Sequence, residues 1–253
     1  MSSTLVKEAS AQAAETKPSV AIHPVAIIDS PLAKSVSLVR PILLAGLVAL
    51  RFNALVADPV STLRTALPCV AIIQFAYAVL CLPVAGSQAG KGARKTRPGE
   101  KKKSDTSPRT TISTAIIALL LTGILTPAVH ILFVLFGAPF LDHVAHTALC
   151  AAHFALLAMF PILYSRGSDG QALTSVAGAS APLDETFGSL VGAVVGAWLG
   201  AIPIPLDWDR DWQKWPVTIL VGMYAGSLLC SSASGTLFYG KRLGGAREWD
   251  HKG

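Results

Sequence analysis

Histidines, the side chains best suited to metal binding and proton transfer near neutral pH, cluster in one part of this sequence. Four of the six lie within 24 residues: His130, His143, His146 and His153. On a helix of 3.6 residues per turn, the last three share one face with Cys150, within roughly 80°. A polar stripe in an apolar segment calls for a functional hypothesis.

The spacing limits what this stripe can bind. His143 and His153 are ten residues apart, which is about 15 Å of helical rise and too far for one metal ion. Neighbours such as His143 and His146 could share an ion, with Asp142 or His130 assisting. Interhelical hydrogen bonding near the non-cytoplasmic surface is the simpler interpretation. We therefore expect no metal ion and no other cofactor.

A second candidate is a run in which acidic and aromatic residues alternate. Its residues of interest are Pro203, Pro205, Asp207, Trp208, Asp209, Arg210, Asp211, Trp212 and Trp215. Three close carboxylates could bind a cation, but the run lacks the glycine and the distal glutamate of a calcium loop. Tryptophan suits the membrane interface, where its apolar ring and its polar N–H are both satisfied. We expect an interfacial anchor with internal pairing between Arg210 and the aspartates.

No complete catalytic set stands out in the sequence. It contains no phosphate-cradling glycine loop, no HExxH motif and no recognisable nucleophile–base pair. We therefore expect a protein without catalytic residues of its own. The alternative is a lipid phosphotransferase or phosphatase that acts at the membrane face through Asp142, His143, His146 and the aspartates at 207–211.

Arg51 and Asn53 are polar residues inside another apolar segment. A charged residue at a helix centre costs roughly 2.5–3.5 kcal/mol on insertion scales. Arg51 lies six residues from the end of the segment, about 9 Å, so its guanidinium could reach outward. A lipid transporter or flippase could use both residues as a polar gate, although no inverted repeat is visible.

These candidates lie in a chain that is typical of a membrane-embedded helical bundle. Hydrophobic residues make up 52% and charged residues 14%, against about 25% charged in a typical soluble domain. The apolar runs reach the length of roughly 20 residues that crosses a hydrocarbon core. We predict an all-α fold of about six spans, with a loop at 165–183. The predicted spans are 38–57, 60–84, 112–137, 143–164, 185–202 and 217–238.

Positive charge predicts the orientation. Residues 85–110 carry a net charge of +6, equal to that of the whole chain. With this loop, both tails and the 165–183 loop on one side, Lys and Arg divide 17 to 2 across the membrane, and the positive side is cytoplasmic. Nucleic-acid binding is not expected, because no folded soluble domain surrounds the basic run.

The predicted organisation follows from these spans and charges. A flexible cytoplasmic tail occupies 1–35, a six-helix transmembrane domain occupies 36–240 with the basic cytoplasmic loop at 85–110, and a second cytoplasmic tail occupies 241–253. Both termini are expected to be cytoplasmic.

Glycine spacing predicts where two helices approach closely. A stripe of glycines recurs every fourth residue in the fifth span, and the sixth span repeats it: Gly188, Gly192, Gly196, Gly200, Gly222 and Gly226. Small residues let helix backbones come together in lipid, where no hydrophobic force drives helices together. We expect these stripes to pack the fifth span against the sixth. Docking of another protein is the alternative, and the two could hold for different faces.

Two blocks, at 130–141 and 192–216, are long and unusual enough in composition to carry a family resemblance. The second contains Gly-Ala-Trp-Leu-Gly-Ala, Pro-Ile-Pro-Leu and Asp-Trp-Asp-Arg in close succession. Together they resemble the PIG-F family of GPI-anchor biosynthesis proteins. The resemblance covers roughly residues 36–240, and the basic loop and both tails fall outside its specific motifs.

The resemblance implies a small multi-pass protein of the endoplasmic reticulum membrane. Family members act with large catalytic subunits that transfer ethanolamine phosphate from phosphatidylethanolamine to GPI mannose. Those partners carry lumenal, metal-dependent domains of the alkaline-phosphatase type. The small family member is a stabilising, non-catalytic subunit, and membrane lipid or GPI intermediates are possible further partners.

Overall fold

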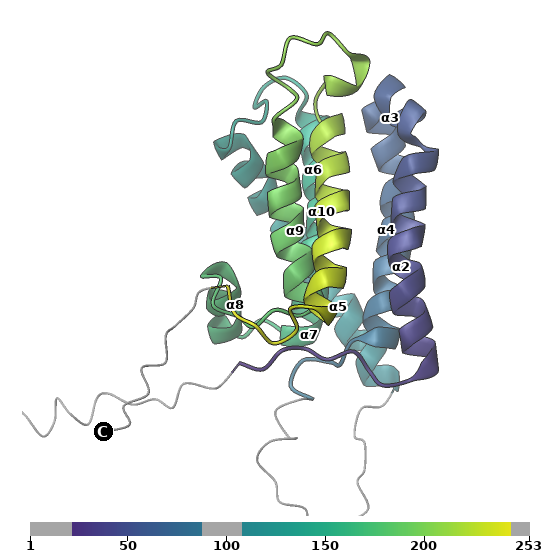
Figure 1. Cartoon of the computed structure of the whole chain (residues 1–253), viewed down its shortest axis with the longest axis vertical. Helices are drawn as coiled ribbons and strands as arrows, with labels where there is room; N and C mark the ends of the chain where they lie inside the picture. Colours follow the sequence, from purple (N-terminus) through teal and green to yellow (C-terminus); the bar gives the residue numbers. More distant parts are fainter. Residues whose placement is uncertain (1–21, 88–107, 244–253) are drawn as a thin grey trace, which may run out of the picture.

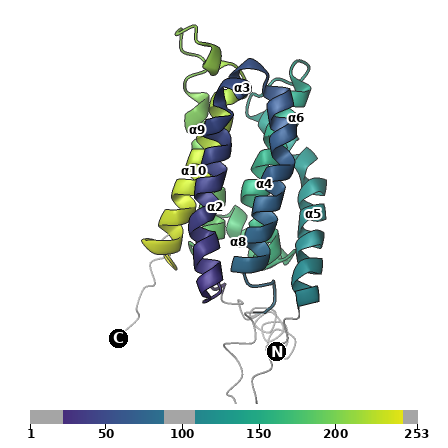
Figure 2. The ribbon, with the colours of Figure 1, turned by 90° about the vertical axis from the view of Figure 1, so that its right-hand side faces the viewer.

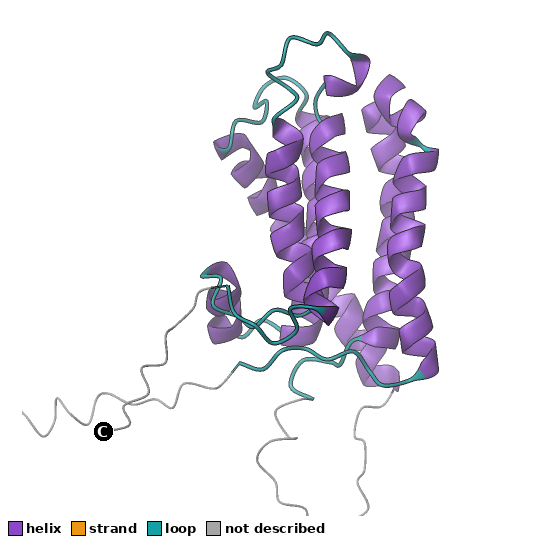
Figure 3. Ribbon diagram, in the orientation of Figure 1, coloured by secondary structure: helices purple, strands orange, loops and turns teal. Residues whose placement is uncertain are grey.

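The structure, a computed structural model, describes residues 22–87 and 108–243 of the chain. Figures 1 and 3 show long helices side by side, with loops gathered at the two ends of the bundle. The described residues form no strand, and one isolated bridge joins Pro182 to Arg242. The helical elements in chain order are α2 (Pro31–Leu50), α3 (Phe52–Ala57), α4 (Pro59–Cys81), α5 (Pro108–Leu135), α6 (Val144–Phe154), the π-helical turn η1 (Ala155–Met159), α7 (Phe160–Arg166), α8 (Gly170–Ala177), α9 (Glu185–Ala201), the 3₁₀ turn η2 (Asp211–Gln213) and α10 (Val217–Thr236).

Among the described residues, five helical segments are long and apolar enough to cross a membrane. They are α2, α4, α5, the continuous segment Val144–Arg166, and α10. Helix α9 is also apolar, but its 17 residues span only about 26 Å. Each of the six predicted spans therefore corresponds to one of these segments, and the predicted all-α membrane fold is confirmed.

The bundle has two ends (Figures 1 and 2). The end that we call the terminal end contains residues 22–30, 82–87, 167–184 and 237–243. The opposite end, called the connection end, contains residues 136–143 and 202–216. Both described chain ends lie at the terminal end, as an even number of spans requires. The cytoplasmic assignment of the terminal end stays a prediction from the charge count.

The segment 22–35 differs from the flexible tail expected there. Val25 is 6% exposed, and its N–H donates to the Asp184 carboxylate at 2.9 Å. The N–H of Ile28 donates to the Cys81 carbonyl at 2.9 Å. The segment thus crosses the terminal end between α9 and α4, held by two backbone N–H groups whose bonds sequence composition does not reveal. The rest of the predicted tail, 1–21, lies outside the described residues.

The first predicted span consists of two helices. Helix α2 begins at Pro31, seven residues before the predicted start, because the Ser30 hydroxyl accepts from the N–H of Ala33 at 3.1 Å and caps it. It ends at Leu50, where Arg51 has φ −103° and ψ 10°, and α3 follows. The first membrane segment is therefore interrupted at a charged residue.

The fourth span changes its hydrogen-bond pattern in the middle. Between α6 and α7 the chain forms the π-helical turn η1, and Pro161 follows it. Proline has no N–H and cannot bond the carbonyl four residues earlier, which is that of Leu157. That carbonyl instead accepts from Ser189 Oγ at 3.0 Å. The missing backbone bond therefore gives neighbouring helices an acceptor in the bundle interior.

The segment 165–183 is not wholly the loop that its Gly/Ser/Ala composition indicates. It contains α8, whose N-cap residue Asp169 accepts from the N–H of Gln171 at 3.4 Å. The helix buries Ala172 and Val176 against the bundle. Eight residues with one buried face give too little hydrophobic periodicity for the sequence to distinguish a short helix from a loop of small residues.

The basic loop and the C-terminal tail also differ from their predicted bounds. Helix α5 begins at Pro108, inside the predicted loop 85–110, and residues 88–107 lie outside the described part. The first residues of the predicted tail pair with the chain ahead of α9: Leu183 N–H donates to the Lys241 carbonyl at 2.7 Å. Residues 244–253 lie outside the described part.

Candidate functional site

The connection between α9 and α10 is organised by one buried amide, that of Gln213. Its Nε2 donates to the carbonyls of Pro203 at 2.7 Å and Leu206 at 2.8 Å. Its Oε1 accepts from the N–H of Arg210 at 2.8 Å. All three bonds join a side chain to backbone, so Gln213 sets the path of the connection.

The aromatic residues of the connection divide into an inner and an outer group. The Trp215 Nε1–H donates to Thr147 Oγ1 on α6 at 3.2 Å and ties the connection to the bundle. Trp208 is 53% exposed, and its ring centroid lies 5.9 Å from that of Trp212. One tryptophan therefore anchors the connection, and another is presented outward.

The acidic residues of the connection differ from the expected internal pairing. Asp207, Asp209, Arg210 and Asp211 are all exposed, and in the described residues Arg210 forms no ion pair with an aspartate. Asp209 has φ 48°, a left-handed conformation that aspartate tolerates better than most residues. The charges are thus exposed on a backbone that Gln213 holds through the N–H of Arg210.

The glycine stripes meet each other inside the chain. A Cβ added at Gly192 would overlap the carbonyl of Gly226, and one added at Gly196 would overlap that of Gly222. Gly188 faces Ser234 and Cys230, and Gly200 faces Thr218. The stripe of α9 is therefore filled by α10, and in this structure a partner would have to approach another face.

His153 is the histidine that joins helices. Its Nδ1 lies 2.6 Å from the Tyr224 hydroxyl on α10, and its Nε2 lies 3.1 Å from the Leu63 carbonyl on α4. A carbonyl can only accept, so Nε2 carries a proton, and in the neutral ring Nδ1 accepts from the tyrosine hydroxyl. Both ring nitrogens are engaged, which leaves none free as a metal ligand.

The other three histidines of the cluster, His130, His143 and His146, lie near the connection end. His143 has φ 58° and precedes α6 as its N-cap residue, and its ring meets that of His146 edge to face at 4.7 Å. The Nδ1 atoms of His146 and His130 are buried without a hydrogen-bond partner among the described residues. Asp142 is exposed. Across residues 22–87 and 108–243, no three His, Cys, Asp or Glu side chains are grouped to hold a metal ion.

Arg51 and Asn53 do not form a pair. Asn53 is exposed, whereas Arg51 is half-buried and lines a narrow cleft between α2, α4 and α10. His153 and Tyr224 line the same cleft. The structure therefore brings Arg51 close to the histidine stripe, a proximity that the sequence did not indicate.

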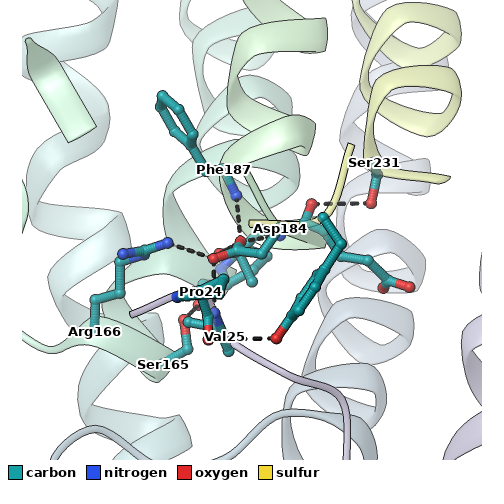
Figure 4. Close-up of polar contacts among 11 residues, drawn as sticks. Pro24, Val25, Ser165, Arg166, Asp184, Phe187 and Ser231 are labelled. Atoms are coloured by element: carbon teal, nitrogen blue, oxygen red, sulfur yellow. Dashed lines mark hydrogen bonds and ion pairs between the residues drawn. The ribbon is translucent and has the colours of Figure 1, made fainter. Parts of the chain in front are cut away.

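A polar site that sequence reasoning missed occupies the terminal end (Figure 4). Asp184 accepts at one carboxylate oxygen from the N–H groups of Thr186 (2.9 Å) and Phe187 (3.0 Å), which caps α9. The other oxygen accepts from Val25 N–H and pairs with the Arg166 guanidinium. One buried carboxylate thus joins the N-terminal segment, α7 and α9.

Glu185 extends this polar site toward α4 and α2. Its carboxylate accepts from the Tyr77 hydroxyl at 2.6 Å and from Ser37 Oγ at 3.1 Å. The guanidinium carbon of Arg40 lies 4.1 Å from the centre of the Tyr77 ring, within cation–π range. Charged groups of two helices, α2 and α9, therefore share one tyrosine of α4.

Arg40 is 4% exposed, in the interior of α2 rather than in the cytoplasmic tail where the charge count placed it. Its Nε donates to Gln74 Oε1 at 2.8 Å. The amide nitrogen of Gln74 donates in turn to the carbonyls of Leu156 (2.9 Å) and Leu157 (3.3 Å), beside the proline-disrupted turn. Arg40 is thus connected to the freed acceptors of the fourth span.

The model of the family described as "GPI biosynthesis protein family Pig-F" matches residues 39–235. The chain belongs to the PIG-F family. The resemblance carried by the blocks at 130–141 and 192–216 is therefore confirmed. In this PIG-F protein the matched region includes the connection, both glycine stripes and the Arg40–Gln74 contact, whereas Val25 lies outside it.

Named relatives agree with this membership. A protein of Neurospora crassa named Glycosylphosphatidylinositol anchor biosynthesis protein 11 is 56% identical over 222 residues, covering 88% of this chain and 82% of that relative. The protein of that name from Pyricularia oryzae is 53% identical, covering 78% and 74%. That from Saccharomyces cerevisiae is 39% identical over 117 residues, covering 46% and 48%. No solved structure matches the chain.

Local signals could have found part of the missed site in this PIG-F protein. Asp184 and Thr186 stand directly before an apolar run, which is the pattern of a helix N-cap. Arg40 and Gln74 are polar residues within apolar runs, which is the same sequence signal that Arg51 carries. No sequence signal links Asp184 to Val25, because the two are 159 residues apart.

Proposed function

We propose that this PIG-F protein is a non-catalytic subunit of GPI ethanolamine phosphate transferases in the endoplasmic reticulum membrane. It binds a catalytic subunit and stabilises it while ethanolamine phosphate is transferred to GPI mannose. The terminal end is cytoplasmic in this proposal, and the connection end faces the lumen.

One observation carries the proposal: the connection holds exposed charged and aromatic groups on a fixed backbone. Arg210 and its neighbouring aspartates have no ion-pair partners in the described residues, while Gln213 fixes the loop beneath them. Aromatic and arginine side chains are enriched in protein interfaces, and positioned charges favour a partner of complementary charge. The surface therefore supports docking of a lumenal domain.

The glycine stripes support a bundle that is complete before the partner arrives. Because α10 fills the stripe of α9, docking does not need to separate these helices. The opposite face of α9 carries the exposed side chains Val194, Val195 and Trp198, which lie toward lipid or toward a partner's membrane helices. The catalytic subunit would then contact the outer face of α9 together with the connection.

Co-purification from mild detergent tests the proposal. Full-length tagged protein should bring down an ethanolamine phosphate transferase, and Trp208→Ala combined with Arg210→Ala should reduce its recovery at least several-fold. Arg109→Ala, an exposed arginine at the terminal end, is the matched control and should bind normally. If no transferase is recovered with the wild-type protein, and transferase abundance is unchanged in cells that lack it, the proposal is wrong.

The enzymatic alternative has a separate test. A lipid phosphotransferase or phosphatase using Asp142, His143 and His146 would turn over substrate as a purified single chain. Alanine at His146 would abolish this turnover. Activity that requires an added catalytic subunit, and that is unchanged by His146→Ala, would support the accessory role.

A further inference from the structure

Arg51 places a positive charge at the break between α2 and α3, inside the first apolar segment of the chain. The twenty residues of α2 rise about 30 Å from the terminal end before this point. Seven more residues lead to Asp58, where the chain turns into α4, which is about 10 Å if they are helical. The Arg51 backbone is therefore roughly two helical turns inside the connection end.

The Arg51 guanidinium has no protein partner among the described residues. Its side chain takes part in none of the hydrogen bonds or ion pairs found across 22–87 and 108–243. Two deeply buried arginines each have a partner: Arg40 bonds Gln74, and Arg166 pairs with Asp184. Arg64 on α4 is exposed and also lacks a partner among the described residues, but unlike Arg51 it does not line the cleft. A charge at membrane depth is costly unless it is paired or reaches polar surroundings. The unused donors of Arg51 therefore call for an acceptor from outside the chain.

The cleft beside Arg51 has apolar walls. Leu47 and Val48 of α2, Leu63 of α4 and Leu220 of α10 line it. Its enclosed space is about 20 Å³, which is room for about one water molecule. Leu63 and Leu220 are buried, whereas Leu47 and Val48 are partly exposed. A larger ligand therefore cannot enter the cleft, and it would lie along the mouth with its apolar part against Leu47 and Val48.

The polar groups deeper in the cleft are already paired. His153 uses both ring nitrogens, one with Tyr224 and one with the Leu63 carbonyl. They do not supply a negative charge to Arg51, since both side chains are neutral in this pair. The acceptor that fits must therefore be anionic and must bring an apolar portion with it.

We propose that Arg51 binds the phosphate of a membrane phospholipid, with an acyl chain lying against Leu47 and Val48, the partly exposed side chains at the mouth of the cleft. A guanidinium offers paired N–H donors that match two phosphate oxygens. The apolar walls make a lipid, rather than free phosphate, the source of that group. This site rests on contacts of the chain alone and does not depend on the proposed partner.

Native mass spectrometry of the full-length protein in dodecyl maltoside, a detergent without phosphate, tests the site. Dioleoyl phosphatidic acid should bind, and Arg51→Ala should weaken its binding about tenfold, whereas dioleoylglycerol should bind both proteins weakly and equally. Arg64→Ala is the matched control, because Arg64 is exposed on α4 at a similar depth and does not line the cleft. It should change binding less than twofold.

Several outcomes would overturn the proposal. If Arg51→Ala and Arg64→Ala weaken phosphatidic acid binding equally, the effect is a general one of positive charge. Displacement of phosphatidic acid by millimolar inorganic phosphate would mean that the apolar walls do not hold a lipid. Unchanged binding by Arg51→Ala would remove the role of Arg51 outright.

A second measurement uses the wild-type protein and does not depend on a variant that folds. Phosphatidic acid with a photoactivatable acyl chain should cross-link to peptides from residues 47–66. Cross-links confined to α5, whose face is also apolar and exposed, would contradict the site. Arg51→Lys keeps the charge and loses the paired donors, so its binding should fall between those of wild type and Arg51→Ala.

Discussion

Arg166 and Asp184 form an ion pair whose side chains are 4% and 0% exposed, at the terminal end of a membrane bundle. The pair joins the last turn of α7 to the first residue before α9 (Figure 4). Partial burial, and then the nearby Asp184 charge, raise the pKa of Tyr239, whose hydroxyl lies 3.5 Å from the Pro24 carbonyl. The C-terminal segment therefore closes over the same pair.

Asp184→Asn should destabilise the protein by about 3 kcal/mol, because it leaves the buried Arg166 charge without a counter-charge. Asparagine keeps the side-chain size and can still cap α9, so the loss reports the charge. Thermal unfolding in detergent, followed by circular dichroism, measures it. Asp169→Asn alters an exposed cap of α8 and should change the free energy of unfolding by less than about 0.5 kcal/mol. Equal effects of the two substitutions would contradict a buried pair.

Gly192→Ala should force α9 and α10 apart, because its Cβ would overlap the backbone of Gly226. Overpacking of this kind costs about 1–3 kcal/mol. Gly123→Ala on α5 meets nothing within 4 Å and should be neutral or slightly stabilising. Thermal unfolding in detergent, followed by circular dichroism, compares the two glycine variants. A tolerated Gly192→Ala would show that the stripes are not in close contact.

Gln74→Leu should cost roughly 3 kcal/mol, since it removes a hydrogen bond to a charged group and two bonds to buried carbonyls. Arg40 would keep only its stacking on Tyr77, and the carbonyls of Leu156 and Leu157 would lose their shared donor. Gln171→Leu, at an exposed position of α8, controls for the change in composition. If Gln74→Leu unfolds at the same midpoint temperature as the wild-type protein, the network contributes no net stability.

Gln213→Ala should loosen the connection without unfolding the bundle. It leaves two carbonyls and the N–H of Arg210 without their partner, and each lost buried partner costs about 1–3 kcal/mol locally. Hydrogen exchange should therefore rise within 203–216, and recovery of the catalytic subunit should fall. Exchange in α4 and α10 should stay at the wild-type level. A uniform increase over the whole chain would instead indicate a global loss of stability.

The spans could be predicted because a membrane requires long apolar runs, whatever packs against them. Pro31 and Ser30 were missed as a helix start because the first apolar run begins later. Helix α8 was missed because eight small and polar residues carry little periodicity. These errors are local, and each concerns where an element begins or whether a short one forms.

The candidate site was predicted less completely, because its residues meet only after folding. Arg51 was recognised from its charge in an apolar run, but its cleft requires Leu220, 169 residues later. Arg40 carries the same signal and was counted as part of the tail, since its partners on α4 are not adjacent in sequence. Gln213 stands in a visible motif, yet only the folded loop distinguishes it from its exposed neighbours.

The contact between Val25 and Asp184 also bears on how the protein is made. A ribosome releases the first residues of the chain long before Asp184 is synthesised, and four of the membrane segments come between them. The contact between Val25 and Asp184 therefore cannot form until α9 begins to emerge, whereas Ile28 can bond Cys81 as soon as α4 is made. The N-terminal segment would thus be attached in two stages, first to α4 and later to the start of α9, and closure of the terminal end would be one of the last steps of biogenesis.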